Sequence, residues 1–317
     1  LAWQVVTGPA LRSAGFWAVA GWRPALRWRR REAGELLRFG APLLGSYLLG
    51  YSQRNTDNLI IGSVQGAAAL GYYSRAYALM LMPLTHITYI MQNVMLASFS
   101  RLRRNRRAVR MAYLRAIGVL ALITMPMMAG LLATAHAFVL TMFGGQWAAM
   151  VPILQLLCVV GLIQPITATS GWLFLSQGRT DLQMRISLLT TPLVVAAFAV
   201  GVLWGALGVA AAYAIVNLVI WYPIMAWSGR LVGLEIRGLL RQLRGPLLSS
   251  LTMAAAVAWV ARWLPADWAA PARLALLVLS GIACYTALAG LLQRRALSDL
   301  LELLRPRRRA ERTTPSD

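Results

Sequence analysis

The chain has 317 residues, of which 59% are hydrophobic and only 13% are charged, and its mean hydropathy is +0.61. A soluble domain carries roughly 25% charged residues, so this composition excludes an ordinary soluble protein and indicates a membrane protein. The formal net charge of +21 comes from arginine alone, because the sequence contains no lysine.

Long uncharged stretches predict an all-α, polytopic membrane protein. Ala116–Gly178 and Ile186–Gly229 contain no Asp, Glu, Lys or Arg, and each is long enough for two spans of about 20 residues. The small residues of FGGQW at 143–147 and of WGALG at 204–208 are typical of tight turns that would divide these stretches. In chain order we expect about nine transmembrane helices, near residues 4–22, 39–62, 70–99, 112–142, 150–176, 183–203, 207–228, 244–264 and 273–292.

The arginines gather in every second connection between these spans. Segments 23–38, 101–115, 179–185, 230–244 and 294–312 hold 26 of the 31 arginines. This alternation follows the positive-inside rule, so we expect these segments and the carboxyl terminus in the cytoplasm. A nucleic-acid-binding surface would not follow the period of the spans, so we expect no nucleic-acid partner. Membrane lipids are the expected partners of the basic segments.

The first segment predicts that the chain is a fragment. The sequence begins with Leu1, and residues 1–22 lack the basic front and small-residue cleavage site of a signal peptide. The charge alternation requires this span to run from outside to inside, which leads us to expect further helices before it.

Two neighbouring predicted spans carry polar stripes. Tyr47, Tyr51, Arg54 and Asn58 share one helical face, with Asp57 one turn from Arg54. In the next span a second face is formed by Arg75, Met82, His86, Tyr89 and Asn93. A third polar patch contains Gln164, Thr167 and Ser170. The candidate substrate-cavity residues are therefore Arg54, Asp57, Asn58, Arg75, His86, Asn93 and Gln164.

Charges inside a membrane span need a reason, because they are costly there. Asp57 and Arg75 each lie five residues from the expected outer end of their helices, about 7–8 Å deep. One interpretation is structural: Arg54, Asp57 and Arg75 pair and pin two antiparallel helices. The other is that the stripes face a water-filled cavity, where the arginines bind an anionic headgroup through bidentate hydrogen bonds. The spacing alone does not separate the two.

The remaining polar candidates also have two interpretations. His86 suits a proton-titrating group, although a lone histidine is more often a satisfied packing residue. Gln164 and its neighbouring hydroxyls suit a cavity lining, or bonds to adjacent helices and to their own backbone. Cys158 and Cys284 lie 126 positions apart in apolar segments, so we expect neither a disulfide nor a zinc site.

One region of the sequence resembles a known family. NTDNLIIGSVQGAAALGYYSRAYALMLMPL at 55–84 resembles the signature region of polysaccharide exporters of the O-antigen and colanic-acid type, within the multidrug/oligosaccharidyl-lipid/polysaccharide exporter superfamily. MFGGQWAAMVPILQLLCVVGLIQPI and SQGRTDLQMR are similar to later parts of these proteins. The resemblance runs from about Phe39 to Arg244.

The resemblance implies two six-helix lobes around a central cavity. The chain would then hold the last helix of the amino-terminal lobe and an amphipathic cytoplasmic linker (1–38), the carboxyl-terminal six-helix lobe (39–243), two additional transmembrane helices (244–292) and a basic cytoplasmic tail (293–317). It also implies that the charges near residue 57 lie on a hairpin that lines the cavity.

The implied function is a flippase of the bacterial inner membrane. It would move undecaprenyl-pyrophosphate-linked oligosaccharide for lipopolysaccharide or exopolysaccharide synthesis, beside the polymerase and glycosyltransferases of that pathway. An ion gradient would drive it, with Asp57 or His86 as candidate carriers.

Three alternatives remain open: a lipid II or multidrug exporter of the same superfamily, a membrane enzyme of the polysaccharide pathway, and a structural membrane subunit. The sequence favours a non-enzyme without metal or cofactor. Its ten acidic residues are scattered, and no phosphate-binding glycine loop, nucleophile elbow or metal-ligand spacing is present in it.

Overall fold

The computed structural model describes residues 2–21, 30–265 and 268–293. Over these ranges the chain has α-helices and two short 3-10 helices and no strand, so the all-α prediction is confirmed there. The helices are α1 (Ala2–Val19), α2 (Arg30–Val64), α3 (Gly66–Leu102), α4 (Arg106–Phe143), α5 (Met150–Ser176), α6 (Thr180–Gly201), α7 (Gly205–Arg230), α8 (Ile236–Trp263) and α9 (Ala270–Leu292). Part of the expected linker, 22–29, and the tail beyond residue 293 lie outside the described residues.

The chain forms two compact units, Leu1–Gly40 and Ala41–Asp317. The first contains α1 and the beginning of α2, and the second contains the rest of α2 and helices α3 to α9. Helix α2 begins nine residues before the predicted span 39–62, at Arg30. The reason is local: glutamate, leucine and arginine are good helix formers, and Glu32 stands in the first turn, where the helix dipole favours an acid. The predicted lobe boundaries stay predictions.

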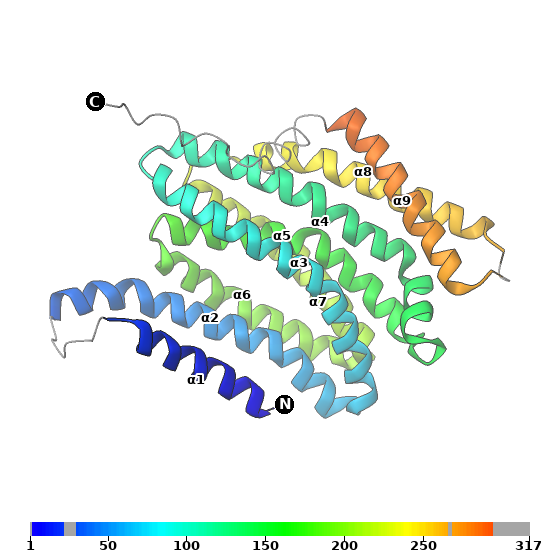
Figure 1. Ribbon diagram of the computed structural model, residues 1–317, viewed down its shortest axis with the longest axis horizontal. Coiled ribbons are helices and arrows are strands. Elements are labelled where there is room, and N and C mark those ends of the chain that lie inside the picture. Colours follow the sequence, from blue (N-terminus) through cyan, green and yellow to red (C-terminus); the bar gives the residue numbers. More distant parts are fainter. Residues whose placement is uncertain (1, 22–29, 266–267, 294–317) are drawn as a thin grey trace. The chain divides into compact units, whose positions relative to one another are not determined.

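Helix α4 has the most varied surroundings in the second unit. It packs against α3 and α5 and also against α8 and α9, while α7 packs against α5 and α6. Figure 1 shows α8 running alongside α4, with α9 crossing α8. Among the largest fully buried side chains are Tyr73, Phe99, Tyr113, Phe174 and Phe198. The core is therefore built around α3, α4 and α5, with aromatic residues filling it.

Both tight turns predicted from small residues are present. Helix α4 ends at Phe143 and is followed by Gly144 with φ +87°, and α7 begins at Gly205 with φ +74°. Glycine adopts this left-handed region without the steric penalty of a side chain. Each turn also contains a short 3-10 helix, Gly145–Trp147 and Val202–Trp204.

A proline inside α4 leaves a backbone carbonyl that α9 satisfies. Pro126 has no N–H, so it cannot donate to the carbonyl of Leu122, four residues earlier. The hydroxyl of Tyr285 in α9 donates to that Leu122 oxygen at 2.8 Å. Within a bilayer a freed carbonyl needs such a partner. Tyr285 therefore ties α9 to the place where α4 loses its own hydrogen bond.

Five segments of the described chain are long and apolar enough to cross a membrane: Arg106–Phe143, Met150–Ser176, Thr180–Arg230, Ile236–Trp263 and Ala270–Leu291. Thr180–Arg230 contains both α6 and α7. Helices α1, α2 and α3 are absent from this set. The helical membrane architecture is therefore supported, and the count of nine spans stays a prediction.

The N-cap at the start of α4 allows a test of local stability. Asn105 precedes the helix in an extended conformation, and its side-chain oxygen accepts a hydrogen bond from Ala108 N at 3.0 Å. We expect Asn105→Ala to lower the free energy of unfolding by about 1 kcal/mol, because it removes this N-cap. Chemical denaturation in detergent measures the loss, and an unchanged midpoint would contradict it.

Candidate functional site

Asp57 of α2 is buried, with only 2% of its surface exposed. Its Oδ2 accepts a hydrogen bond from the Tyr73 hydroxyl of α3 at 3.0 Å, and its Oδ1 accepts one from the Asn58 backbone N–H at 2.7 Å. Both carboxylate oxygens are thus satisfied by neutral donors. Hydrogen bonding of this kind makes a buried carboxylate tolerable without a cationic partner.

Asp57 does not form the ion pair that its position suggested. The ion pairs within 4 Å among the described residues are Arg31–Glu35 and Arg179–Asp181. Asp57 points toward Tyr73 inside the unit, whereas Arg54 and Arg75 are exposed. Mutual pairing of the three charges was therefore the wrong account of the burial of Asp57.

Three tyrosines extend the Asp57 contact across the bundle. The ring of Tyr73 stacks on Tyr77, with centroids 6.1 Å apart, and Tyr77 lies 6.2 Å from Tyr213 of α7. Tyr213 in turn packs against Phe198 of α6 at 5.6 Å. This row of aromatic side chains joins α3, α7 and α6, and Asp57 of α2 contacts the row through Tyr73.

Arg54 and Gln164 lie beside this aromatic row. Arg54 lies within electrostatic range of Tyr77 and Tyr213, and the side chain of Gln164 in α5 lies close to Tyr77. The side-chain oxygens of Asn58 and Gln164 are buried and have no hydrogen-bond partner among the described residues. Buried acceptors of this kind call for a water molecule or a ligand donor. The structure thus gathers Arg54, Asp57, Asn58 and Gln164 near one tyrosine row.

The other three candidates follow the exposed face of α3. Arg75, His86 and Asn93 are all exposed, in line with their predicted common face. His86 Nδ1 lies 2.7 Å from the carbonyl oxygen of Met82, so Nδ1 carries the proton in this contact and Nε2 points away from that bond. Tyr89, on the same face, is 67% exposed. Polar and apolar side chains share this face, since Met82 and Ile90 are each 65% exposed.

The three tyrosines near Asp57 were not among the site residues predicted from the sequence. Tyr73 and Tyr77 are spaced i, i+4 on α3, which gave a local signal for a common face. Tyr213 lies 136 positions after Tyr77 and carries no sequence signal for this contact. Its place depends on the packing of α7.

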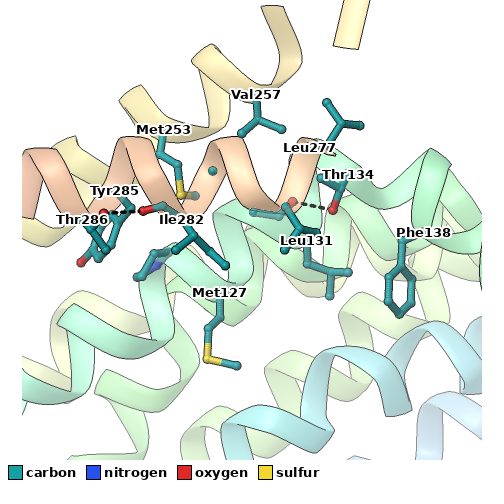
Figure 2. Close-up of a pocket in the computed structure, with 14 residues that line it drawn as sticks. Met127, Leu131, Thr134, Phe138, Met253, Val257, Leu277, Ile282, Tyr285 and Thr286 are labelled. Atoms are coloured by element: carbon teal, nitrogen blue, oxygen red, sulfur yellow. Dashed lines mark hydrogen bonds between the residues drawn. The ribbon is translucent and has the colours of Figure 1, made fainter. Parts of the chain in front are cut away.

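A separate cavity of about 410 Å³ lies between α4, α8 and α9. Figure 2 shows Met127, Leu131, Met253 and Ile282 around it, on helices from both sides. The Thr134 and Thr286 hydroxyls that reach its lining donate to carbonyls of their own helices. The cavity therefore offers hydrocarbon surface, and no candidate polar residue lies on it.

Comparison with known proteins shows which family this chain resembles. Residues 1–152 match the model of a family described as polysaccharide biosynthesis protein. The lipopolysaccharide biosynthesis protein WzxC of Escherichia coli K12 is 27% identical over 226 residues, which are 69% of this chain and 46% of WzxC. The teichuronic acid biosynthesis protein TuaB of Bacillus subtilis 168 is 34% identical over 169 residues, which are 53% of this chain and 35% of TuaB.

The chain is therefore similar to the polysaccharide biosynthesis protein family over residues 1–152 and to WzxC and TuaB. The resemblance carried by residues 55–84 is confirmed, since this region lies inside the matched range. The chain spans about half the length of WzxC, or less in the case of TuaB.

The fold of this chain is also found in a solved structure. The lipid II flippase MurJ, in an inward closed conformation, matches with a TM-score of 0.68 and 16% sequence identity. The match covers 89% of this chain and 57% of the MurJ chain. At this identity the similarity concerns the arrangement of helices alone.

Proposed function

We propose that this chain supplies the carboxyl-terminal half of a flippase for undecaprenyl-pyrophosphate-linked oligosaccharides in the bacterial inner membrane. The observation that carries the proposal is that Arg75, His86 and Asn93 are exposed along α3 and that Arg54 of α2 is exposed as well. A polar face on a membrane-spanning helix is stable where it borders water or protein. It therefore suits the wall of a central cavity.

The chemistry of the face fits an anionic headgroup. Arg54 and Arg75 present guanidinium groups, which bind phosphate oxygens through paired N–H donors. His86 and Asn93 add hydrogen-bonding groups further along α3, where a sugar would lie. The prenyl chain would stay in the bilayer while the headgroup crosses.

The transport step follows from two arrangements of two lobes around a fixed site. Rocking of one lobe against the other would open the cavity first to the cytoplasm and then to the outside. In this assignment helices α2 to α7 form the carboxyl-terminal lobe, α8 and α9 are the additional pair, and the carboxyl terminus is cytoplasmic. The polymerase and glycosyltransferases of the pathway are the proposed partners, and no catalytic residue is assigned.

Export of lipid-linked glycan tests this function. The chain replaces the matching part of WzxC in an E. coli strain that lacks WzxC, and surface glycan is measured at equal membrane abundance. We expect the chimera to restore export. A correctly inserted chimera without export would contradict the proposal.

Replacing both cavity arginines provides the residue-level test. We expect Arg54→Gln with Arg75→Gln to reduce export by about 100-fold or more, since two charge-assisted hydrogen bonds contribute roughly 1.5–3 kcal/mol each. The matched control, Arg237→Gln with Arg241→Gln, removes the same charge from exposed positions of α8. Export that falls equally in both variants would show a general charge effect and remove these residues from the transport path.

A further inference from the structure

Another cavity, with two arginines in its lining, lies at the opposite end of α6 and α7 from the turn that connects them. Its volume is about 400 Å³, and its lining comes from the end of α5, the beginning of α6 and the end of α7. Phe174 and Ile186 form its buried floor, and Arg185, Arg230, Trp227 and Leu189 stand around it. The tyrosine row and the exposed face of α3 contribute no residue to this lining.

No acid in the described part of the chain forms an ion pair with either arginine of this cavity. Neither Arg185 nor Arg230 belongs to the ion pairs found among the described residues. The nearby acid Asp181 is held by Arg179, whose Nε and Nη2 donate to its two oxygens at 3.0 and 3.1 Å. Asp181 has a weaker, electrostatic interaction with Arg185. Its carboxylate is thus already occupied by Arg179.

An apolar track continues from each arginine along its helix. Arg185, Leu189 and Leu193 are spaced i, i+4, i+8 on α6, and the two leucines are 57% and 54% exposed. They extend about 12 Å from Arg185 along the helix. On α7, Trp227 lies one turn before Arg230 and is 40% exposed. Tryptophan at this place is typical of the headgroup level of a membrane.

We propose that this cavity binds an anionic glycerophospholipid of the surrounding membrane. Arg185 and Arg230 bind the phosphodiester, Trp227 packs against the glycerol region, and one acyl chain follows Leu189 and Leu193 along α6. Both arginines lie in arginine-rich connections that the charge alternation assigns to the cytoplasmic side, where basic pockets between helices bind anionic headgroups. The site stands apart from the proposed transport cavity and does not depend on it.

Lipid retention by the full 317-residue chain tests this site. The protein is reconstituted in nanodiscs of phosphatidylglycerol and phosphatidylcholine, and native mass spectrometry counts the lipids that stay bound. We expect wild type to retain phosphatidylglycerol in preference to phosphatidylcholine. We expect Arg185→Gln with Arg230→Gln to weaken that retention by about 30-fold, from the usual contribution of two basic residues near anionic lipid.

Two controls separate the site from general surface charge. Arg237→Gln with Arg241→Gln, which removes the same charge outside the cavity, should retain phosphatidylglycerol as wild type does. Arg185→Lys with Arg230→Lys keeps the charge and should retain most of the binding. Equal loss in both glutamine variants would overturn the proposal.

Two measurements on wild type overturn the proposal without any variant. One is a lack of preference for phosphatidylglycerol over phosphatidylcholine, which does not depend on how the variants fold. The other is release of the bound lipid by millimolar inorganic phosphate, which would assign the arginines to a soluble anion.

Discussion

Replacing Tyr73 with phenylalanine lowers the free energy of unfolding by about 2–3 kcal/mol, which is the usual cost of removing a donor from a buried charged acceptor. The ring stays in place, so its stacking on Tyr77 is retained and no cavity forms. Asp57 Oδ2 loses the one side chain that donates to it, at a position where 2% of the residue is exposed. Denaturation of the detergent-solubilised protein measures the change.

The adjacent tyrosine supplies the matched control. The Tyr72 hydroxyl donates to the carbonyl oxygen of Gln146 at 3.2 Å in an exposed contact. Tyr72→Phe should therefore cost less than about 1 kcal/mol, since water replaces the lost partner. Equal effects of the two substitutions would mean that the Asp57 contact contributes nothing beyond an ordinary surface hydrogen bond.

Replacing Gly208 with alanine should cost about 3 kcal/mol or more and reduce the amount of folded protein in the membrane. A Cβ on Gly208 would collide with the backbone oxygen of Gly201 and would lie 2.7 Å from Cβ of Trp204. Backbone atoms of α6 cannot rotate away as a flexible side chain does, so α6 and α7 must separate. Thermal unfolding and membrane yield measure the result.

A glycine without close neighbours tests whether this effect is steric. Gly171 lies inside α5, and a Cβ there would meet no atom within 4 Å. Gly171→Ala should be neutral or stabilise the helix by up to about 1 kcal/mol. A comparable loss at Gly171 would contradict the close-approach argument for Gly208.

The course of the helices was largely predictable from the sequence. Uncharged runs and small-residue turns are local signals, and the ends of α4 at Phe143 and of α6 at Gly201 follow from Gly144 and the glycines near 205. The additional turns at the start of α2 were missed because a hydrophobicity pattern ends where the charged residues begin. Helix propensity, which continues through Glu32 and Glu35, decides that boundary.

The partner of Asp57 was not predictable in the same way. Matching depth along two antiparallel helices selected Arg75, but depth does not fix which face of a helix turns inward. Tyr73 and Arg75 are two residues apart, which places them about 200° apart around α3. The packing of α3 on α5 turns Tyr73 inward and leaves Arg75 exposed.

The hydrogen bond from Tyr285 to Leu122 joins two helices that are synthesised at different times. Its two residues are 163 positions apart, so α4 leaves the ribosome and enters the bilayer long before α9 is synthesised. During that interval the carbonyl freed by Pro126 has to rely on water or a temporary neighbour. The Leu122 carbonyl therefore gains its tertiary partner only after α9 has been made.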